Sequence, residues 1–249
     1  MSTHDARTIS ISHNIQELAE KAAERLVCIR QDHSTGPFTI ALAGGSTPLP
    51  LYRLLTTAPY SAQIRQSSTC FFFGDERCVP PSDPQSNYRF ARENLFEPLE
   101  ISDDNVFRMN GEQHAEKAAQ LYEDQLREFF QRPEGFPRFD VVLLGLGPDG
   151  HTASLFPETD ALYETRRLVV SNFVPSHDSH RLTITFPLIN HAANVFFLIS
   201  GKSKAEAAGK LLNQADSEWI PACEVAPADG SLYLFLDEDA ASGWKEPGS

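Results

Sequence analysis

The sequence predicts an α/β fold: a three-layer αβα sandwich around a mostly parallel central sheet, in one domain spanning residues 1–249. Three observations predict it. Strand-like and helix-like segments alternate along the chain, which is typical of parallel sheets with helices on both faces. The strand-like runs, such as Val141–Leu144, are continuously apolar, as strands covered on both faces are. Several of these runs end in glycine-rich turns that lead into helical segments, as in Rossmann-like folds.

The individual elements follow from spacing and composition. Apolar residues recur at helical spacing between Asn14 and Arg30, so this segment is predicted to be an amphipathic helix. A second helix is expected to start at Pro48 and run through Leu55, because proline suits the first turn. Further helices are predicted at 86–95, 112–131, 188–193 and 202–212, with a last helical turn at 237–241. Strands are predicted at 38–43, 69–73, 141–144, 167–170, 181–186, 194–201 and 231–236.

Composition restricts the partners of the chain. A net charge of -13 disfavours nucleic acid and anionic membranes, and a small anion would need a local cluster of cations and backbone donors. No apolar run is long enough to span a bilayer, and Met1–Ser12 lacks the apolar core of a secretory signal, so a cytoplasmic protein is expected. The cysteines form no Cys-x-x-Cys pair, so we expect neither a zinc site nor a disulfide framework; they are Cys28, Cys70, Cys78 and Cys223.

The turn after the strand 38–43 has two interpretations. As an anion cradle, it offers backbone amides and two hydroxyls at the start of a helix. As an ordinary strand-to-helix turn, it uses Ser46 or Thr47 as a helix cap. The candidate binding residues of this cradle are Gly44, Gly45, Ser46 and Thr47.

The stretch from Phe139 to Phe156 is the centre of the predicted site. Its turn presents Asp149 and His151 at the carboxyl end of a central strand, where open α/β sheets bind ligands, and a helix is expected to begin at His151. Residues 145–150 also match the dinucleotide fingerprint G-x-G-x-x-G. Two features count against a nucleotide: a pyrophosphate would meet the carboxylate of Asp149, and the strand-like run 168–172 ends without an acidic residue for a ribose.

Four segments together resemble the 6-phosphogluconolactonases. In order, they are Ala43–Leu49, Phe73–Arg77 with Ser86–Tyr88, Gly145–Phe156 and Arg181–Thr185. The resemblance implies the fold of glucosamine-6-phosphate deaminases and ribose-5-phosphate isomerases. It also implies hydrolysis of 6-phosphoglucono-1,5-lactone in the pentose phosphate pathway, without metal or cofactor. The chain departs from the family pattern at Pro175–His180, where a lysine-and-proline segment is usual, and at Leu234, where tryptophan is frequent.

The resemblance suggests roles for the site residues. His151 is expected to be the general base and then the acid, because a neutral imidazole accepts a proton near neutral pH and can return it. Asp149 is expected either to orient this ring or to cap the following helix. Arg77 would stabilise the carbonyl oxygen or hold sugar hydroxyls, and Asp75 would hold hydroxyls or Arg77 itself.

The cations have competing interpretations. By resemblance, Arg181 and Lys204 face the sugar phosphate. Otherwise Arg181 is a cation at a sheet edge and Lys204 an exposed lysine among several. His177 and His180 either replace the missing lysine beside Arg181 or belong to a mobile polar loop.

Two rival functions remain open. A deaminase or aldose-ketose isomerase on the same fold usually has Asp-Glu-Tyr at residues 75–77 and a further acidic residue after its Asp-Gly-His, where this chain has Thr152–Phe156. A non-catalytic sugar-phosphate sensor would follow a DNA-binding segment, whereas here the fold is expected to begin within the first twenty residues, and a sensor has no need of His151. The expected partner is a small sugar-phosphate lactone, bound by a monomer or weak homo-oligomer.

Overall fold

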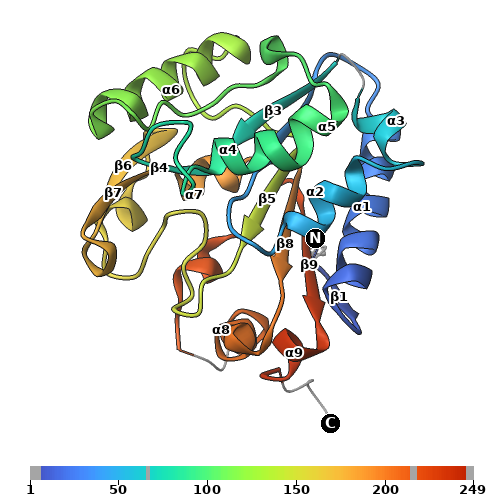
Figure 1. The fold of residues 1–249 in the computed structure, drawn as a ribbon. Helices are drawn as coiled ribbons and strands as arrows, with labels where there is room; N and C mark the ends of the chain where they lie inside the picture. The colour runs from blue at the N-terminus through green and yellow to red at the C-terminus, as the bar shows by residue number, and fades with distance from the viewer. Residues whose placement is uncertain (1–6, 66–67, 214–217, 245–249) are drawn as a thin grey trace.

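A parallel six-stranded sheet forms the centre of the protein in the computed structural model, which describes residues 7–65, 68–213 and 218–244 (Figure 1). Each strand is hydrogen-bonded in parallel to its neighbours in the order β1-β9-β8-β5-β2-β3. The predicted, mostly parallel sheet is therefore confirmed. The strands are β1 (Arg7–Ser12), β2 (Phe38–Leu42), β3 (Thr69–Phe73), β5 (Val141–Gly145), β8 (Asn194–Ile199) and β9 (Ser231–Asp237).

A second, antiparallel sheet in the order β4-β7-β6 lies beside the first. It consists of β4 (Asp75–Arg77), β6 (Val169–Val174) and β7 (Ser179–Ile184). The sequence predicted two of these strands but not that they leave the central sheet, and it placed β6 too early, at 167–170. The register pairs Arg77 directly with Arg181, so two predicted site residues are cross-strand neighbours.

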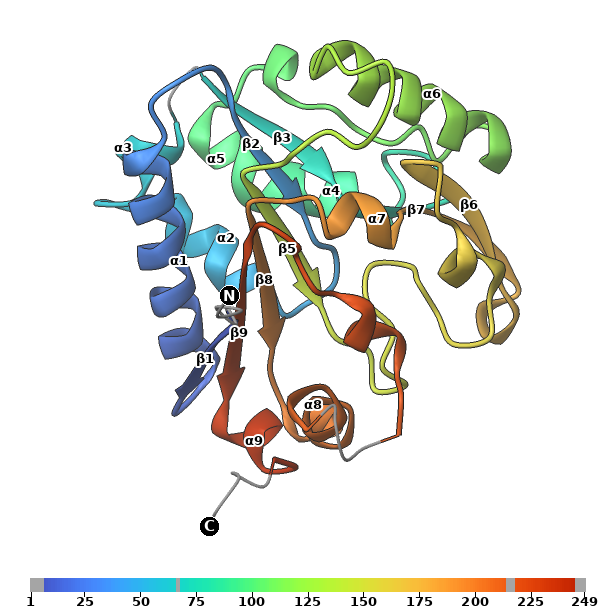
Figure 2. The same ribbon diagram turned by 180° about the vertical axis from the view of Figure 1, so that it is seen from behind.

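Helices lie on both sides of the central sheet, as the two opposite views show (Figures 1 and 2). In both views α1 to α3 lie on one side, and α6 lies on the other beside the small sheet. The helices are α1 (Ile15–Asp32), α2 (Leu49–Leu55), α3 (Ser61–Ile64), α4 (Asn87–Ala91), α5 (Glu97–Leu99), α6 (Ala115–Phe129), α7 (Phe186–Ile189), α8 (Ala205–Leu212) and α9 (Glu238–Ala241). A π-helix (Arg92–Phe96) joins α4 to α5, and a 3-10 helix (Lys202–Lys204) precedes α8.

The core is continuous across both faces of the central sheet. Every residue of β2 and β3 is buried, which explains why these strands are mostly apolar, with one buried threonine in each. Phe72 of β3 packs against several aromatic rings, with a centroid distance of 4.6 Å to Phe107 and 5.2 Å to Phe139. Rigid strands therefore carry the turns that form the site. In the described residues, no helix is long and apolar enough to cross a membrane.

One strand was missed from the sequence, and one predicted helix does not form. β1 was not predicted, because Arg7–Ser12 alternates polar and apolar residues at the edge of the sheet; residues 1–6 of the polar N-terminal segment lie outside the described part. The helix expected from His151 to Phe156 is instead a tight loop. Ala153 has a φ of 47°, and Thr152 and Leu155 form an isolated bridge. A left-handed residue and a bridge both interrupt helical hydrogen bonding.

Candidate active site

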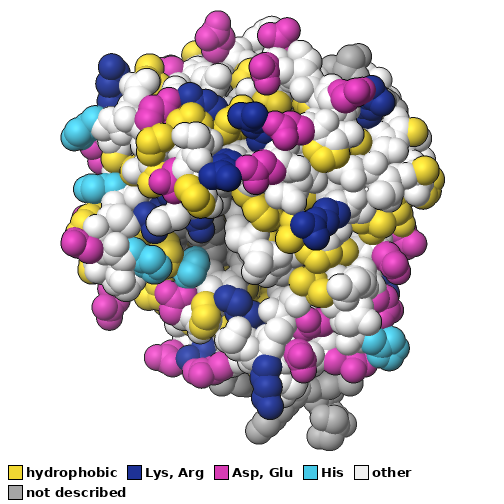
Figure 3. Space-filling model, in the orientation of Figure 1, with side chains coloured by type: hydrophobic (Ala, Val, Ile, Leu, Met, Phe, Trp, Pro, Cys, Tyr) yellow, Lys and Arg dark blue, Asp and Glu magenta, His cyan; other side chains and the backbone are white. Residues whose placement is uncertain are grey.

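A cleft of about 310 Å³ opens where the carboxyl ends of β2 and β5 meet the small sheet. Small-molecule sites have volumes of roughly 300–1,000 Å³. Figure 3 shows a hollow near the middle of this face, with basic side chains and histidine at its rim. All but one of the site residues predicted from the sequence line the cleft: Gly44, Gly45, Ser46, Thr47, Asp75, Arg77, His151, Arg181 and Lys204. The exception is Asp149, which is hydrogen-bonded to His151.

His151 and Asp149 form a hydrogen-bonded pair on the loop after β5. The distance from His151 Nδ1 to Asp149 Oδ1 is 2.6 Å. Burial would raise the pKa of Asp149, but the hydrogen bond and the charge of His151 lower it below its ordinary value. The carboxylate is therefore an acceptor, so Nδ1 carries a hydrogen and Nε2 of the neutral ring is left to accept a proton. Residues 150–159 contain no helix, so the role of Asp149 as a helix cap is excluded.

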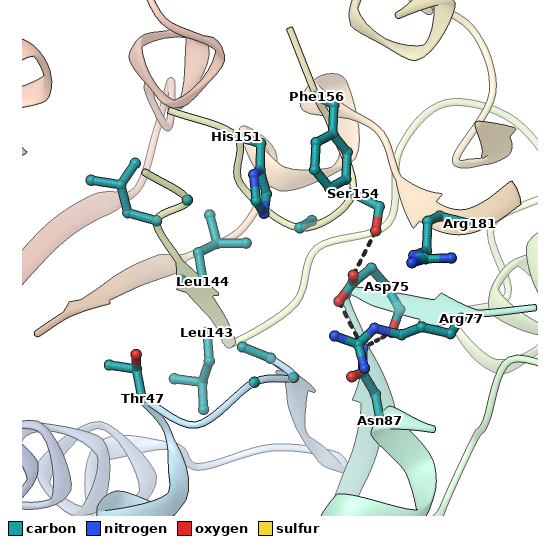
Figure 4. Close-up of a pocket in the computed structure, with 18 of the residues that line it drawn as sticks. Thr47, Asp75, Arg77, Asn87, Leu143, Leu144, His151, Ser154, Phe156 and Arg181 are labelled. Carbon is teal, nitrogen blue, oxygen red and sulfur yellow. Dashed lines mark hydrogen bonds between the residues drawn. The ribbon is translucent and has the colours of Figure 1, made fainter. Parts of the chain in front are cut away.

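Packing also fixes the plane of the His151 ring. Phe156, from the far end of the same loop, stacks on it with a centroid distance of 3.9 Å. Gly147 also lies against the pair, because a Cβ atom there would overlap both the imidazole and the Asp149 carboxylate. Glycine is needed at this position because any side chain would displace the pair. Figure 4 shows the ring of His151 directed into the cleft.

Three cations line the same cleft. Arg77 and Arg181 are directly opposite each other on β4 and β7, an arrangement that is unfavourable for like charges. Burial and then the neighbouring Arg77 lower the pKa of Arg181. Burial also lowers the pKa of Lys204, while Asp149 opposes this change. None of the three forms an ion pair within the described ranges, so this cleft is suited to an anionic ligand despite the acidic chain.

Arg77 and Arg181 are oriented by neutral groups. Arg181 donates to Ser179 Oγ at 2.6 Å and to the carbonyl of His180 at 3.1 Å. Arg77 donates to the carbonyl of Gln85. These bonds place the guanidinium groups without neutralising them, and both remain able to bind an anion.

The turn 44–47 lines the cleft, and the structure does not support its interpretation as a helix cap. Helix α2 begins at Leu49, its N-cap residue is Pro48, and no side chain caps it. The hydroxyls of Ser46 and Thr47 form no hydrogen bond within residues 7–65, 68–213 and 218–244. Both hydroxyls are therefore available to a ligand in the cleft.

Gly44 lies against the side chain of Asn87, and replacing it should destabilise the protein. A Cβ atom at this position would overlap the Asn87 amide, which is buried. We expect Gly44→Ala to lower the free energy of unfolding by about 1–3 kcal/mol, the usual effect of overpacking. Denaturant titration measures it. The double variant with Asn87→Ala should lose less than the sum of the two single variants, whereas an unchanged stability of Gly44→Ala would contradict the close contact.

Asp75 does not hold Arg77, one of the roles expected for it. Within the described residues it forms no ion pair; instead Oδ1 accepts from Asn87 Nδ2 at 3.0 Å and Oδ2 accepts from Ser154 Oγ at 2.7 Å. Asn87 and Ser154 both line the cleft but were not among the predicted site residues. The sequence signal for them was their position inside two of the four motif segments, Ser86–Tyr88 and Gly145–Phe156.

The comparisons with known proteins agree with this geometry. The family described as glucosamine-6-phosphate isomerases/6-phosphogluconolactonase matches residues 13–234. The chain belongs to this family. It is 41% identical over 244 residues to the 6-phosphogluconolactonase of Synechocystis sp., covering 94% of this chain and 97% of that protein. The structure of the 6-phosphogluconolactonase from Trypanosoma cruzi superposes with a TM-score of 0.86 at 31% identity, covering 95% of this chain and 96% of that one.

A sugar-phosphate deaminase shares this fold. A monomeric glucosamine-6-phosphate deaminase superposes with a TM-score of 0.78 at 25% identity and covers 95% of this chain and 99% of that one. The predicted family and fold are thus confirmed, and both chemistries occur on this fold.

The segment Pro175–His180, where the family usually has lysine and proline, brings a histidine to the cleft. His177, at the end of a 3-10 helix (Pro175–His177), lines the cleft, and its ring lies 5.4 Å from that of Phe156. His180 is exposed and contacts Ser171 and Phe173. Of the two, only His177 is placed to substitute for a basic residue in the cleft.

Proposed function

We propose that this protein hydrolyses 6-phosphoglucono-1,5-lactone to 6-phosphogluconate. The observation that carries the proposal is the presence in one cleft of a carboxylate-oriented imidazole, at His151, and of three cations without carboxylate partners. A lactone hydrolase needs the first to activate water, and a phosphorylated substrate needs the second. The names of the relatives in the lactonase branch support the same reaction.

The reaction follows from the tautomer of His151. Nε2 takes a proton from a water molecule, whose oxygen attacks the carbonyl carbon of the lactone and gives a tetrahedral oxyanion. Arg77 stabilises the negative charge on this oxygen. As the bond from the carbonyl carbon to the ring oxygen breaks, the imidazolium returns the proton to the ring oxygen. The products are a carboxylic acid and a hydroxyl group, and Asp149 stabilises the imidazolium in between.

The phosphate group is held by Arg181 and Lys204, with the hydroxyls of Ser46 and Thr47 as further donors. Support for this assignment comes from the position of all four residues at the cleft. Among the described residues, the two cations have no carboxylate partner and the two hydroxyls form no hydrogen bond. Burial disfavours the charged forms of Arg181 and Lys204 and so lowers the pKa of each. A phosphate dianion bound between them would stabilise both positive charges.

Product binding should weaken with rising pH because of Lys204. Its pKa is lowered by burial, so its ammonium group loses the proton at a lower pH than an ordinary lysine, whose pKa is about 10.4. Calorimetric titration with 6-phosphogluconate above neutral pH measures the effect. Lys204→Arg should keep its affinity across the same range, since guanidinium stays protonated. A parallel loss in both proteins would assign the titration to another group.

The rival deaminase reaction needs a carboxylate free to move a proton at carbon. Both oxygens of Asp75 are already bonded to neutral donors, and Thr152–Phe156 contains no acidic residue. A sensor has no use for the His151–Asp149 pair.

We further propose that the protein acts in the cytoplasm as a monomer or weak homo-oligomer.

The decisive experiment supplies fresh 6-phosphogluconolactone to the purified protein and follows its disappearance above the spontaneous background. Lactonase activity is expected. Ammonia release from glucosamine 6-phosphate would favour the deaminase reaction instead. Binding of 6-phosphogluconate without turnover of either substrate would favour a sensor.

A further inference from the structure

Ser154 attaches the loop of His151 to the small sheet. Its Oγ donates to Asp75 Oδ2 of β4 at 2.7 Å, and its amide donates to Thr183 Oγ1 of β7 at 3.2 Å. Its carbonyl accepts from Asn172 Nδ2 of β6 at 2.9 Å. One residue, three positions after His151, is thus bonded to all three strands of the sheet that carries Arg77 and Arg181.

Asp75 is the centre of a longer chain of hydrogen bonds. Asn87 donates through Nδ2 to Oδ1 of Asp75 at 3.0 Å and to its backbone carbonyl at 2.9 Å. The backbone N–H of Asn87 donates to Oε1 of buried Glu76 at 2.7 Å, and this bond fixes Asn87 at the start of α4. Figure 4 shows Ser154, Asp75 and Asn87 connected in this order along one wall of the cleft.

The bonding of Asp75 restricts its role. The side chain is buried, and each carboxylate oxygen accepts from a neutral donor. A group arranged in this way orders its neighbours, because its two oxygens hold the side chains of Asn87 and Ser154 in fixed positions. The neighbour on one side, Ser154, lies between His151 and Phe156, which stacks on the imidazole.

We propose that Ser154 and Asp75 are positioning residues, which set the place of His151 relative to Arg77 and Arg181 and take no part in proton transfer. This inference rests on the proposed lactonase function. Attack requires reacting atoms about 3–3.5 Å apart, and a misplacement of about 1 Å can cost about a hundredfold in rate. The loop of His151 and the arginines belong to different sheets, so their separation depends on such a connection.

The first test removes the hydroxyl of Ser154. Ser154→Ala should lower kcat by about 10- to 100-fold through misplacement of His151, with KM for the lactone within about threefold. Thr39→Val is the matched control, because the hydroxyl of Thr39 is equally buried and donates to Asp140 Oδ2 at 2.8 Å in the amino-terminal half of β2, away from the cleft. Both variants should show a similar fall in melting temperature, but Thr39→Val should keep wild-type kcat. Equal kcat values for the two variants would overturn the proposal.

The second test separates position from charge at Asp75. In Asp75→Asn, the new amide oxygen can accept from Asn87 and the new NH₂ group can donate to Ser154 Oγ, since a hydroxyl both donates and accepts. The chain of bonds is then retained without the negative charge. We expect kcat of Asp75→Asn to exceed that of Asp75→Ala at least about tenfold, the order of a misplacement effect. Equal loss in both variants would show that the carboxylate itself takes part in the reaction.

The wild-type protein distinguishes the failure of this inference from failure of the proposed function. If the wild type does not hydrolyse the lactone, the function is wrong. If it does, and Ser154→Ala turns over normally or Asp75→Asn is as inactive as Asp75→Ala, the positioning role alone is wrong.

Discussion

His151→Ala is expected to lower kcat by at least about a hundredfold, the low end of what general acid–base catalysis supplies, while leaving the phosphate contacts intact. The reason is that Nε2 is the proposed proton acceptor, and the bond from Nδ1 to Asp149 holds the ring in the required tautomer. Initial rates with fresh lactone, corrected for spontaneous hydrolysis, measure the effect at saturating substrate.

His191→Ala provides the control for this measurement. His191 is exposed, lies outside the cleft and should be dispensable for turnover. The His151 variant must also bind 6-phosphogluconate, so that a folding defect is not mistaken for lost chemistry. Near-normal turnover of a purified, folded His151→Ala protein would remove this imidazole from the mechanism.

Arg181→Ala should raise KM for the phosphorylated lactone by about 10- to 100-fold, because a hydrogen bond to a charged group is worth about 1.5–3 kcal/mol. The slow hydrolysis of unphosphorylated glucono-1,5-lactone should hardly change, since that substrate has no phosphate for the guanidinium to bind. Steady-state kinetics on both lactones give the comparison.

The matched control is Arg166→Ala, which removes an exposed arginine outside the cleft and changes the net charge by the same amount. It separates the local contact from the general loss of positive charge in an acidic protein. If Arg181→Ala impairs both lactones equally, Arg181 acts on the sugar ring or the carbonyl and not on the phosphate.

The sequence predicted the central sheet well because its strands carry a local signal. The runs in β2, β3 and β5 are mostly apolar, and each is followed by a turn of glycine or charged residues. The edge strand β1 has no such signal, since it is specified by pairing with β9, more than two hundred residues later. The separate small sheet was missed for a related reason: local periodicity does not say which strands pair.

The residues of the cleft were largely found, whereas the bonds among them were not. His151, Arg77 and Arg181 were recognised because they lie in segments that resemble the family's motifs. The link from Asp75 to Ser154 joins residues 79 positions apart, and only the folded chain brings them together. The loop 151–156 was mistaken for a helix because its composition allows one; the left-handed conformation of Ala153 excludes it.

Phosphate held by Arg181 and Lys204, as proposed, would link the two sheets. Arg181 belongs to the antiparallel sheet, whereas Lys204 follows β8 of the parallel one. A dianion held by both is a non-covalent cross-link, formed when substrate arrives and broken when product leaves. In the proposed enzyme, bound substrate should therefore hold the two sheets together more firmly than the empty cleft does.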